Sequence, residues 1–274
     1  MAHPSGTRLG LAHVAAMGTS LLMFLPVYLI VVNALKSRGE ASGLSAAFPK
    51  SLQWGNFAEV IDKGNLVTGF LNSLLYSSVS TVLATLVAAM AAFVLSRKRT
   101  RINRFIYLFL IMGIALPINF FTLTAVMQAT QLINTKLGMI FLYVSTQIPF
   151  SIFLIYGFIE TIPRELDEAA TVDGCGPFRL FFSVILPLLT PVLVTAGILN
   201  FLGVWSDFLF PLYYLNDSAN WPMTLAVYNF FGRFNTQWNL VSANILLNII
   251  PVIIVYLLGQ RYILSGMTSG AVKG

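Results

Sequence analysis

The chain has 274 residues, of which 57% are hydrophobic and only 9% are charged, and its mean hydropathy is +0.80. This apolar content exceeds what a water-soluble domain of this length can bury. The net charge of +6 does not indicate a nucleic-acid partner, because five of the sixteen Lys and Arg residues lie in one short loop at 97–104. The composition therefore excludes an ordinary soluble protein and predicts a membrane protein.

Six uncharged stretches are each longer than the roughly 20 apolar residues that a helix needs to cross a bilayer. Helices are expected because every backbone N–H and C=O group inside lipid needs a partner within the protein. A β-barrel is excluded because the stretches do not alternate between polar and apolar residues. We predict an all-α polytopic membrane protein with a single transmembrane domain over residues 1–274. Its six transmembrane helices are expected at about 14–35, 69–96, 105–130, 138–160, 184–212 and 241–263.

The first two spans have different characters. The first runs to Leu35, which is longer than the apolar region of a secretory signal, so no cleaved signal peptide is expected. The second contains the small, apolar sequence "LYSSVSTVLATLVAAMAAFVL" at 75–95, which indicates close helix packing. A lipid-facing helix of ordinary Ala content is the alternative.

The basic loop "RKRTRINR" at 97–104 sets the expected orientation, because short cytoplasmic loops carry an excess of Lys and Arg. With six alternating spans, both termini and the segment after the fourth span are then cytoplasmic, while 36–68, 131–138 and 216–240 face outward. The predicted location is the plasma (inner) membrane of a prokaryote, with membrane lipid as the surroundings of the chain.

Catalytic and metal-binding patterns are missing from the sequence. Cys175 is the single cysteine, and both histidines, His3 and His13, lie near the N-terminus away from any cluster of carboxylates. Thiol and metal chemistry therefore have no support, and we expect no metal site. No phosphate-binding G-x-x-x-x-G-K-[ST] run is present, so this chain is not expected to hydrolyse ATP.

The segment "ETIPRELDEAATVDGCGPFRLFFSVILPLLTP" at 160–191 holds half of the ten acidic residues. Pro163 suits the first turn of a helix, whose positive dipole end would face the following carboxylates. Gly174 and Gly176 can adopt the left-handed conformation that ends a helix, and Pro177 can start the next one. The segment predicts a short capped helix, which is either a solvated amphipathic linker or a peg that docks into a partner.

The sequence "EAATVDGCGPFRLFFSVILP" resembles the EAA loop of binding-protein-dependent ABC importer permeases. That pattern reads E-A-A, three residues, G, nine residues, I, one residue, L-P, and Val184 replaces its Ile. The matching residues are Glu168, Ala169, Ala170, Gly174, Leu186 and Pro187, and the resemblance assigns coupling to the ATPase to them and to Asp173. The cytoplasmic coupling-helix (EAA) loop then spans 161–183.

Three further stretches resemble the carbohydrate (di/oligosaccharide) branch of that family, whose members include the G-type subunits of maltose permeases. They are "FPKSLQWGNFAEVI" at 48–61, "FLGVWSDFLFPLYYL" at 201–215 and "SGMTSGAVKG" at 265–274. The family often has Asn where Ser206 stands. The resemblance implies a sugar substrate, a second permease subunit in a heterodimer, two copies of an ATP-binding subunit that holds ATP and Mg, and an extracytoplasmic solute-binding protein. No cofactor is expected in this chain itself.

Polar residues at membrane depth are costly, so they are candidates for the solute pathway. Asp207 follows Trp205 late in the fifth span and is interpreted either as a lining residue or as a structural hydrogen-bond partner. Buried amides in membrane helices also serve helix contacts, so the other candidates have the same two interpretations. The amide candidates for the pathway are Asn119, Asn200, Asn244 and Asn248.

The outer segment at 216–239 is rich in aromatic residues and has two charges. In relatives of the G-type subunit this segment reaches into the docked binding protein, which would assign contact to Trp221, Tyr228, Phe230 and Arg233. An interfacial re-entrant segment is the alternative. The resemblance places the C-terminal tail against the ATPase pair, whereas its composition alone predicts a frayed end.

Two other classes of function remain open. An ion-coupled secondary transporter is expected to show intramembrane acids or inverted repeats, and only Asp207 is of that kind. An intramembrane enzyme needs a nucleophile or a metal site, which is missing. Within the importer class, the alternative is a permease for polyamines, phosphate esters or peptides, because the EAA loop is shared among those branches.

Overall fold

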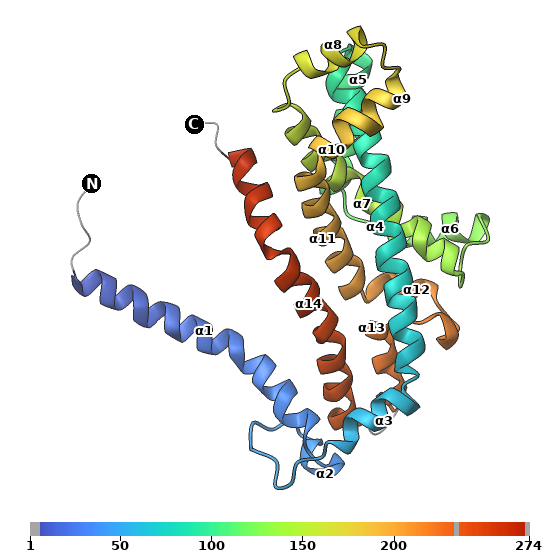
Figure 1. Cartoon of the computed structure of the whole chain (residues 1–274). Helices are drawn as coiled ribbons and strands as arrows, with labels where there is room; N and C mark the ends of the chain where they lie inside the picture. The colour runs from blue at the N-terminus through green and yellow to red at the C-terminus, as the bar shows by residue number, and fades with distance from the viewer. Residues whose placement is uncertain (1–5, 233–235, 272–274) are drawn as a thin grey trace. The chain divides into compact units, whose positions relative to one another are not determined.

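The computed structural model describes the backbone of residues 6–232 and 236–271, and the side chains of 13–232 and 236–262. All regular structure in these described ranges is helical (Figure 1). The chain forms two compact units. Unit 1 contains the residues up to Val67 together with Ala226–Ile250, and unit 2 contains Thr68–Leu225 together with the residues from Pro251.

The N-terminal helices are α1 Gly6–Ala34, α2 Arg38–Ala41, α3 Gly55–Lys63, α4 Leu66–Arg97, α5 Arg101–Ala115, α6 Phe120–Ala129 and α7 Lys136–Ile159. The segment after α7 forms α8 Glu165–Val172, α9 Pro177–Arg179, the π-helix η1 Leu180–Ile185 and α10 Leu186–Leu188. The rest forms α11 Thr190–Ser206, α12 Leu209–Tyr214, η2 Ser218–Asn220, α13 Met223–Ala226, η3 Val227–Phe230 and α14 Trp238–Ala271.

Four continuous helices are long and apolar enough to cross a membrane, namely His13–Ala34, Leu66–Arg97, Lys136–Ile159 and Trp238–Tyr262. They coincide with four of the six predicted spans. The other two predicted spans are not single helices. The third is α5 and α6 with a bend of 114°, and the fifth is broken by a bend of 76° between Pro177–Leu188 and Thr190–Ser206. The described chain thus holds four to six spans.

Proline accounts for the break in the third predicted span. Leu116 precedes Pro117 and has extended backbone angles, because the proline ring disfavours the helical conformation of the residue before it. Asn119 then starts α6 as its N-cap, with its side-chain oxygen accepting a hydrogen bond from the N–H of Thr122 at 3.1 Å.

The fifth predicted span is also shorter than expected. Pro191 occupies the first turn of α11, directly after the bend, where its missing N–H needs no partner. At the other end, α11 stops at Ser206 because Asp207 is extended, whereas the sequence predicted a helix to 212. The sixth predicted span was expected to end at 263, and α14 continues to Ala271.

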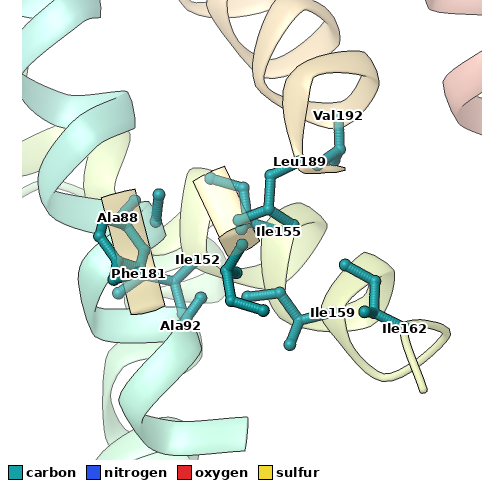
Figure 2. Close-up of a cluster of buried hydrophobic side chains, with 11 residues drawn as sticks. Ala88, Ala92, Ile152, Ile155, Ile159, Ile162, Phe181, Leu189 and Val192 are labelled. Atoms are coloured by element: carbon teal, nitrogen blue, oxygen red, sulfur yellow. The ribbon is translucent and has the colours of Figure 1, made fainter. Parts of the chain in front are cut away.

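The main core cluster of unit 2 joins α4, α7 and the broken helix after α8. Figure 2 shows Ile152, Ile155 and Ile159 of α7 pointing toward Ala88 and Ala92 of α4 and toward later side chains of the chain. The later members are Ile162, Phe181, Ile185, Leu189 and Val192. Ala88, Ala89 and Ala92 of α4 are fully buried, so the packed interpretation of the small-residue span is confirmed for this face of the helix.

Unit 1 is held around the end of α1 by amide side chains. The Asn56 amide nitrogen donates to the carbonyl oxygens of Ala34 and Lys36 at 2.8 and 2.9 Å, which satisfies carbonyls that the helix end leaves open. The Asn239 amide nitrogen of α14 in turn donates to Asn56 Oδ1 at 3.0 Å.

Candidate functional site

The helix α8 starts at Glu165, two residues after Pro163, so the prediction that Pro163 lies in its first turn is wrong. Arg164 is its N-cap residue, and its carbonyl oxygen accepts from the N–H groups of Asp167 and Glu168 at 2.9 and 3.1 Å. Three carboxylates, Glu165, Asp167 and Glu168, lie in the first turn. Negative charge there is favourable because it faces the positive end of the helix dipole.

The end of α8 is a Schellman motif centred on Gly174. The N–H of Cys175 donates to the Ala170 carbonyl at 2.9 Å, and the N–H of Gly174 donates to the Thr171 carbonyl at 3.0 Å. Gly174 has φ +80°, as the sequence predicted. The same prediction for Gly176 is wrong, because it has φ −69° and ψ 164° and serves as the residue before α9, which begins at Pro177.

Contacts with the end of α4 hold α8 in place. Arg97 Nε lies 2.6 Å from Asp167 Oδ2, and the pair is largely shielded from solvent, with side-chain exposures of 12% and 17%. The Arg97 guanidinium also donates to the Ile162 carbonyl at 3.3 Å. Arg164 donates to the Ser96 carbonyl at 3.2 Å. The loop at 97–104 and the segment at 160–173 therefore share one end of unit 2, where Figure 1 shows α8 beside the start of α5.

Sequence analysis missed the role of Arg97, which it counted only as one member of a topology-setting basic loop. The available signal was positional. Arg97 ends the uncharged second span and Asp167 belongs to the acidic segment, and the predicted topology placed both on one side of the membrane.

The two alanines of the EAA pattern differ in their exposure to solvent. Ala170 is buried, whereas Glu168, Ala169 and Asp173 are exposed. Val172 beside them is 87% exposed. Leu186 and Pro187, the last residues of the pattern, belong to α10 and line a separate cavity of about 590 Å³ with Thr81 and Thr85 of α4.

A second cavity, of about 240 Å³, holds polar and aromatic side chains from three elements of unit 2. We call it the solute cavity. Its residues include Tyr143, Gln147 and Phe150 of α7, Asn200 of α11, Phe210 of α12, and Asp207 between the last two helices. Two of the predicted pathway residues, Asn200 and Asp207, are thus brought together.

Asp207 forms structural hydrogen bonds, and it also lines this cavity. Its carboxylate accepts from the Tyr143 hydroxyl at 2.9 Å and from the N–H groups of Phe210 and Leu209 at 3.2 and 3.3 Å. These bonds fix the start of α12 against α7. The Thr224 hydroxyl donates to the Asp207 carbonyl at 2.8 Å.

Gln147 is the polar residue of the cavity that sequence analysis missed. Its side chain is buried, and neither its amide nitrogen nor its amide oxygen has a hydrogen-bond partner among the residues that the structure describes. Buried amides are normally hydrogen-bonded, so this side chain is available to a ligand or to water in the cavity. The signal in the sequence was Gln147 itself, a polar side chain in the middle of the fourth span, four residues after Tyr143 on the same helix face.

The other predicted pathway residues lie elsewhere. Trp205 is almost fully buried between the rings of Phe70 and Phe201, whose centroids lie 5.7 and 5.6 Å from its own. Asn200, which does line the cavity, also donates to the Ser151 hydroxyl of α7 at 2.8 Å and so forms a helix contact. Asn119 is an exposed helix cap, and Asn244 and Asn248 belong to the part of α14 in unit 1.

The predicted binding-protein contacts also differ in exposure. Tyr228 is 42% exposed, whereas Phe230 is buried. Trp221 is half-buried, and its indole N–H donates to the Leu215 carbonyl at 3.0 Å. Arg233 lies outside the described residues. Among these four residues, Tyr228 has the most accessible side chain that the structure describes.

Comparisons with known proteins identify the family of the chain. The family model of the binding-protein-dependent transport system inner membrane component matches residues 82–268. The probable starch degradation products transport system permease protein AmyC of Thermoanaerobacterium thermosulfurigenes is 32% identical over 255 residues, which cover 93% of each chain. The melibiose/raffinose/stachyose import permease protein MelC of Bacillus subtilis is also 32% identical, over 254 residues and 92% of each chain.

A solved structure shares the fold. A chain of a bacterial ABC transporter involved in the import of the acidic polysaccharide alginate superposes with a TM-score of 0.82 at 20% sequence identity, covering 96% of this chain and 99% of that one.

Proposed function

The chain belongs to the family of binding-protein-dependent transport system inner membrane components, and on that premise we propose that it forms half of the translocation pathway of an ATP-driven sugar importer. The observation that carries the proposal is the pairing of a matched family with an anchored, exposed α8. This family is a transport component, so we assign the chain no catalytic reaction of its own.

We propose that α8 docks into a cleft of a separate ATP-binding subunit. Two features support this. The Schellman motif and the Arg97–Asp167 pair hold α8 rigidly to unit 2, and the outer face of α8 presents Glu168, Ala169 and Val172 without covering side chains. A helix held in this way transmits a push from its partner to α4 and α7 as one body, which suits gating between two arrangements of the spans. ATP and Mg would be bound by that partner.

The complete assembly follows from the same proposal. It contains a second permease subunit, two copies of the ATP-binding subunit and an extracytoplasmic solute-binding protein, which Tyr228 and its neighbours would contact. We propose six spans, in which each bent pair crosses once, with both termini in the cytoplasm; the basic loop 97–104 supports this orientation. Under this arrangement residues 1–274 act as one permease domain.

A sugar is the substrate that the solute cavity supports best. Its central group, Gln147, offers one acceptor and two N–H donors without partners, which matches the hydroxyl groups of a carbohydrate. Phe150 and Phe210 also line the cavity and contribute aromatic rings to it. The printed names of relatives such as AmyC and MelC also refer to starch products and to oligosaccharides.

One observation favours a different solute. Asp207 places a carboxylate in the cavity, and a carboxylate would attract a cationic solute such as a polyamine. However, three hydrogen bonds already engage this carboxylate. We therefore propose the neutral sugar and use the polyamine as a test outcome.

The test is to tag the chain in its native membrane, extract it gently in detergent and identify every co-purifying polypeptide by mass spectrometry. A second permease subunit, a nucleotide-binding subunit and a solute-binding protein are expected. The binding protein is then screened with oligosaccharides and polyamines, and uptake is measured in reconstituted vesicles. A chain that purified alone and moved solute along an ion gradient would overturn the importer proposal, and a binding protein selective for polyamines would overturn the sugar.

A further inference from the structure

A third cavity, of about 480 Å³, lies at the end of unit 2 that carries the basic loop 97–104. We propose that it binds the headgroup of an anionic phospholipid. Three arginines from the loop and the first turn of α5 line it, together with two tyrosines and leucine side chains of α4 and α5. The arginines are Arg99, Arg101 and Arg104, and the tyrosines are Tyr107 of α5 and Tyr156 of α7.

The arginines leave the cavity with uncompensated positive charge. Arg99 pairs with Glu160 at 2.7 Å, which neutralises one of the three. Arg101 and Arg104 are exposed, and neither forms an ion pair with any residue that the structure describes. Planar guanidinium groups can bind phosphate oxygens in a bidentate manner, so two such groups at one cavity suit a phosphate monoester or diester.

The start of α5 adds to this charge. The Thr100 hydroxyl caps the helix by accepting from the N–H of Asn103 at 3.1 Å, and α5 continues for 15 residues, so its positive dipole end lies at the cavity. The dipole alone identifies no site, but it has the same sign as the arginines and strengthens their preference for an anion.

The apolar part of the cavity selects a lipid rather than a free phosphate. Tyr107 and Tyr156 stack with centroids 4.1 Å apart, and Leu108 lies beside them. Along the same helix, Phe105 and Phe109 are 69% and 65% exposed and stack on each other. Basic residues above aromatic and apolar ones reproduce the order of headgroup, interface and acyl chain in a bilayer leaflet.

Orientation by the basic loop does not by itself explain this arrangement. Positive charge in the loop is sufficient to set topology, whereas the stacked tyrosines and the cavity between α4, α5 and α7 are not needed for it. A bound headgroup would also restrain the loop that begins at Arg97, the residue that holds α8. The lipid site stands on its own contacts, and only this last consequence rests on the proposed function.

The test uses the complete complex purified in neutral detergent and titrated with three probes, which are short-chain phosphatidylglycerol, short-chain phosphatidylcholine and inorganic phosphate. Native mass spectrometry counts the bound molecules. We expect saturable binding of phosphatidylglycerol that is at least 10-fold tighter than binding of phosphatidylcholine. The Arg101→Ala/Arg104→Ala double variant should weaken phosphatidylglycerol binding at least 10-fold.

The matched control is the Arg38→Ala/Lys50→Ala double variant, which removes two exposed basic residues from unit 1 and should leave lipid binding unchanged. Arg101→Lys/Arg104→Lys keeps the charge and should bind with intermediate affinity, which separates loss of the site from loss of folding. Equal binding of the two lipids, or unchanged binding by the alanine variant, would overturn the proposal. Binding of inorganic phosphate as tight as that of phosphatidylglycerol would also overturn it, because the lipid chains would then contribute nothing.

Discussion

The segment around α8 and the solute cavity lie in the same unit, but they differ in whether their polar side chains have partners within the protein. Around α8 the inward-facing charges have partners, with Arg97 bound to Asp167 and Arg164 bound to the Ser96 carbonyl. In the solute cavity the amide of Gln147 has no hydrogen-bond partner among the described residues.

This difference separates a mechanical role from a binding role. Satisfied polar contacts fix one geometry, which a coupling element needs if it is to move with the spans. A polar group without a partner in the protein is available to a ligand, which can form the missing hydrogen bonds. The region around α8 is thus expected to respond to mutation through stability and coupling, and the cavity through solute affinity.

Arg97→Ala should have the largest effect, because it leaves Asp167 as a shielded, unpaired carboxylate and removes the donors to the Ile162 carbonyl. Loss of one partner of such a pair costs about 3 kcal/mol. We expect a lower thermal unfolding temperature in detergent and nearly complete loss of solute-stimulated ATP hydrolysis by the purified complex.

Arg99→Ala is the matched control, since its ion pair with Glu160 is exposed at the Arg99 side chain and contributes about 0.5 kcal/mol. If the two variants were equally stable and equally coupled, Arg97 would not anchor α8. Exchange of the charges, as Arg97→Asp with Asp167→Arg, should restore part of the coupling.

Gly174→Val should have the next largest effect. Gly174 has φ +80°, and a β-branched residue in this conformation costs about 2 kcal/mol. The space around Gly174 is open, so the effect comes from the backbone and not from a clash. Coupled ATP hydrolysis should fall several-fold. Gly176→Val is the control, because its φ of −69° suits any residue and its surroundings are also open; an equal loss in both variants would contradict the role of the Schellman motif.

The substitution Gln147→Leu tests whether the solute cavity acts through solute affinity. The substitution keeps the approximate volume and removes a buried amide without partners, so thermal stability should stay the same or rise by about 1 kcal/mol. The KM for solute uptake should rise about 10-fold. Asn200→Leu is the contrasting variant, since it strands the Ser151 hydroxyl and should lower stability. A Gln147→Leu protein with unchanged KM and lower stability would mean that the amide has a structural role.

The sequence predicted the helical class, the four continuous spans and the end of α8 at Gly174, because each depends on local composition or on a single Gly. It placed Pro163 in the first turn of α8, whereas the helix begins at Glu165. It failed where several segments act together. The bends at Pro117 and before Pro191 interrupt stretches that are continuously apolar. Hydropathy carries no information on the direction of a helix axis, so it did not predict these bends. The partner of Asp167 lies 70 residues away on α4, and no local pattern identifies it.

The prediction of site residues was limited in the same way, because contacts between distant segments cannot be read from local sequence. Asp207 was identified because a charge within a span is rare, whereas Gln147 was missed because amides in spans are common and most serve helix contacts. Trp205 was selected for its neighbours in the sequence, but packing between Phe70 and Phe201 buries it. What distinguished Gln147 was the absence of a partner for its amide in the described chain, which only a structure with side chains reveals.

Glu168→Ala should have the smallest effect on the chain and still impair the complex. Glu168 is exposed on α8, so its loss should change the stability of this chain by less than about 0.5 kcal/mol. If α8 docks into an ATP-binding subunit, the lost contact should weaken assembly and lower coupled ATP hydrolysis a few-fold, measured by titrating the ATP-binding subunit onto the permease pair. Glu165→Ala removes an equal charge from the same turn and is the control for long-range electrostatics. If Glu168 makes a specific docking contact, the Glu168 variant must bind the ATP-binding subunit more weakly than the Glu165 variant. Equal affinities would mean that the acidic first turn of α8 is only a solvated surface.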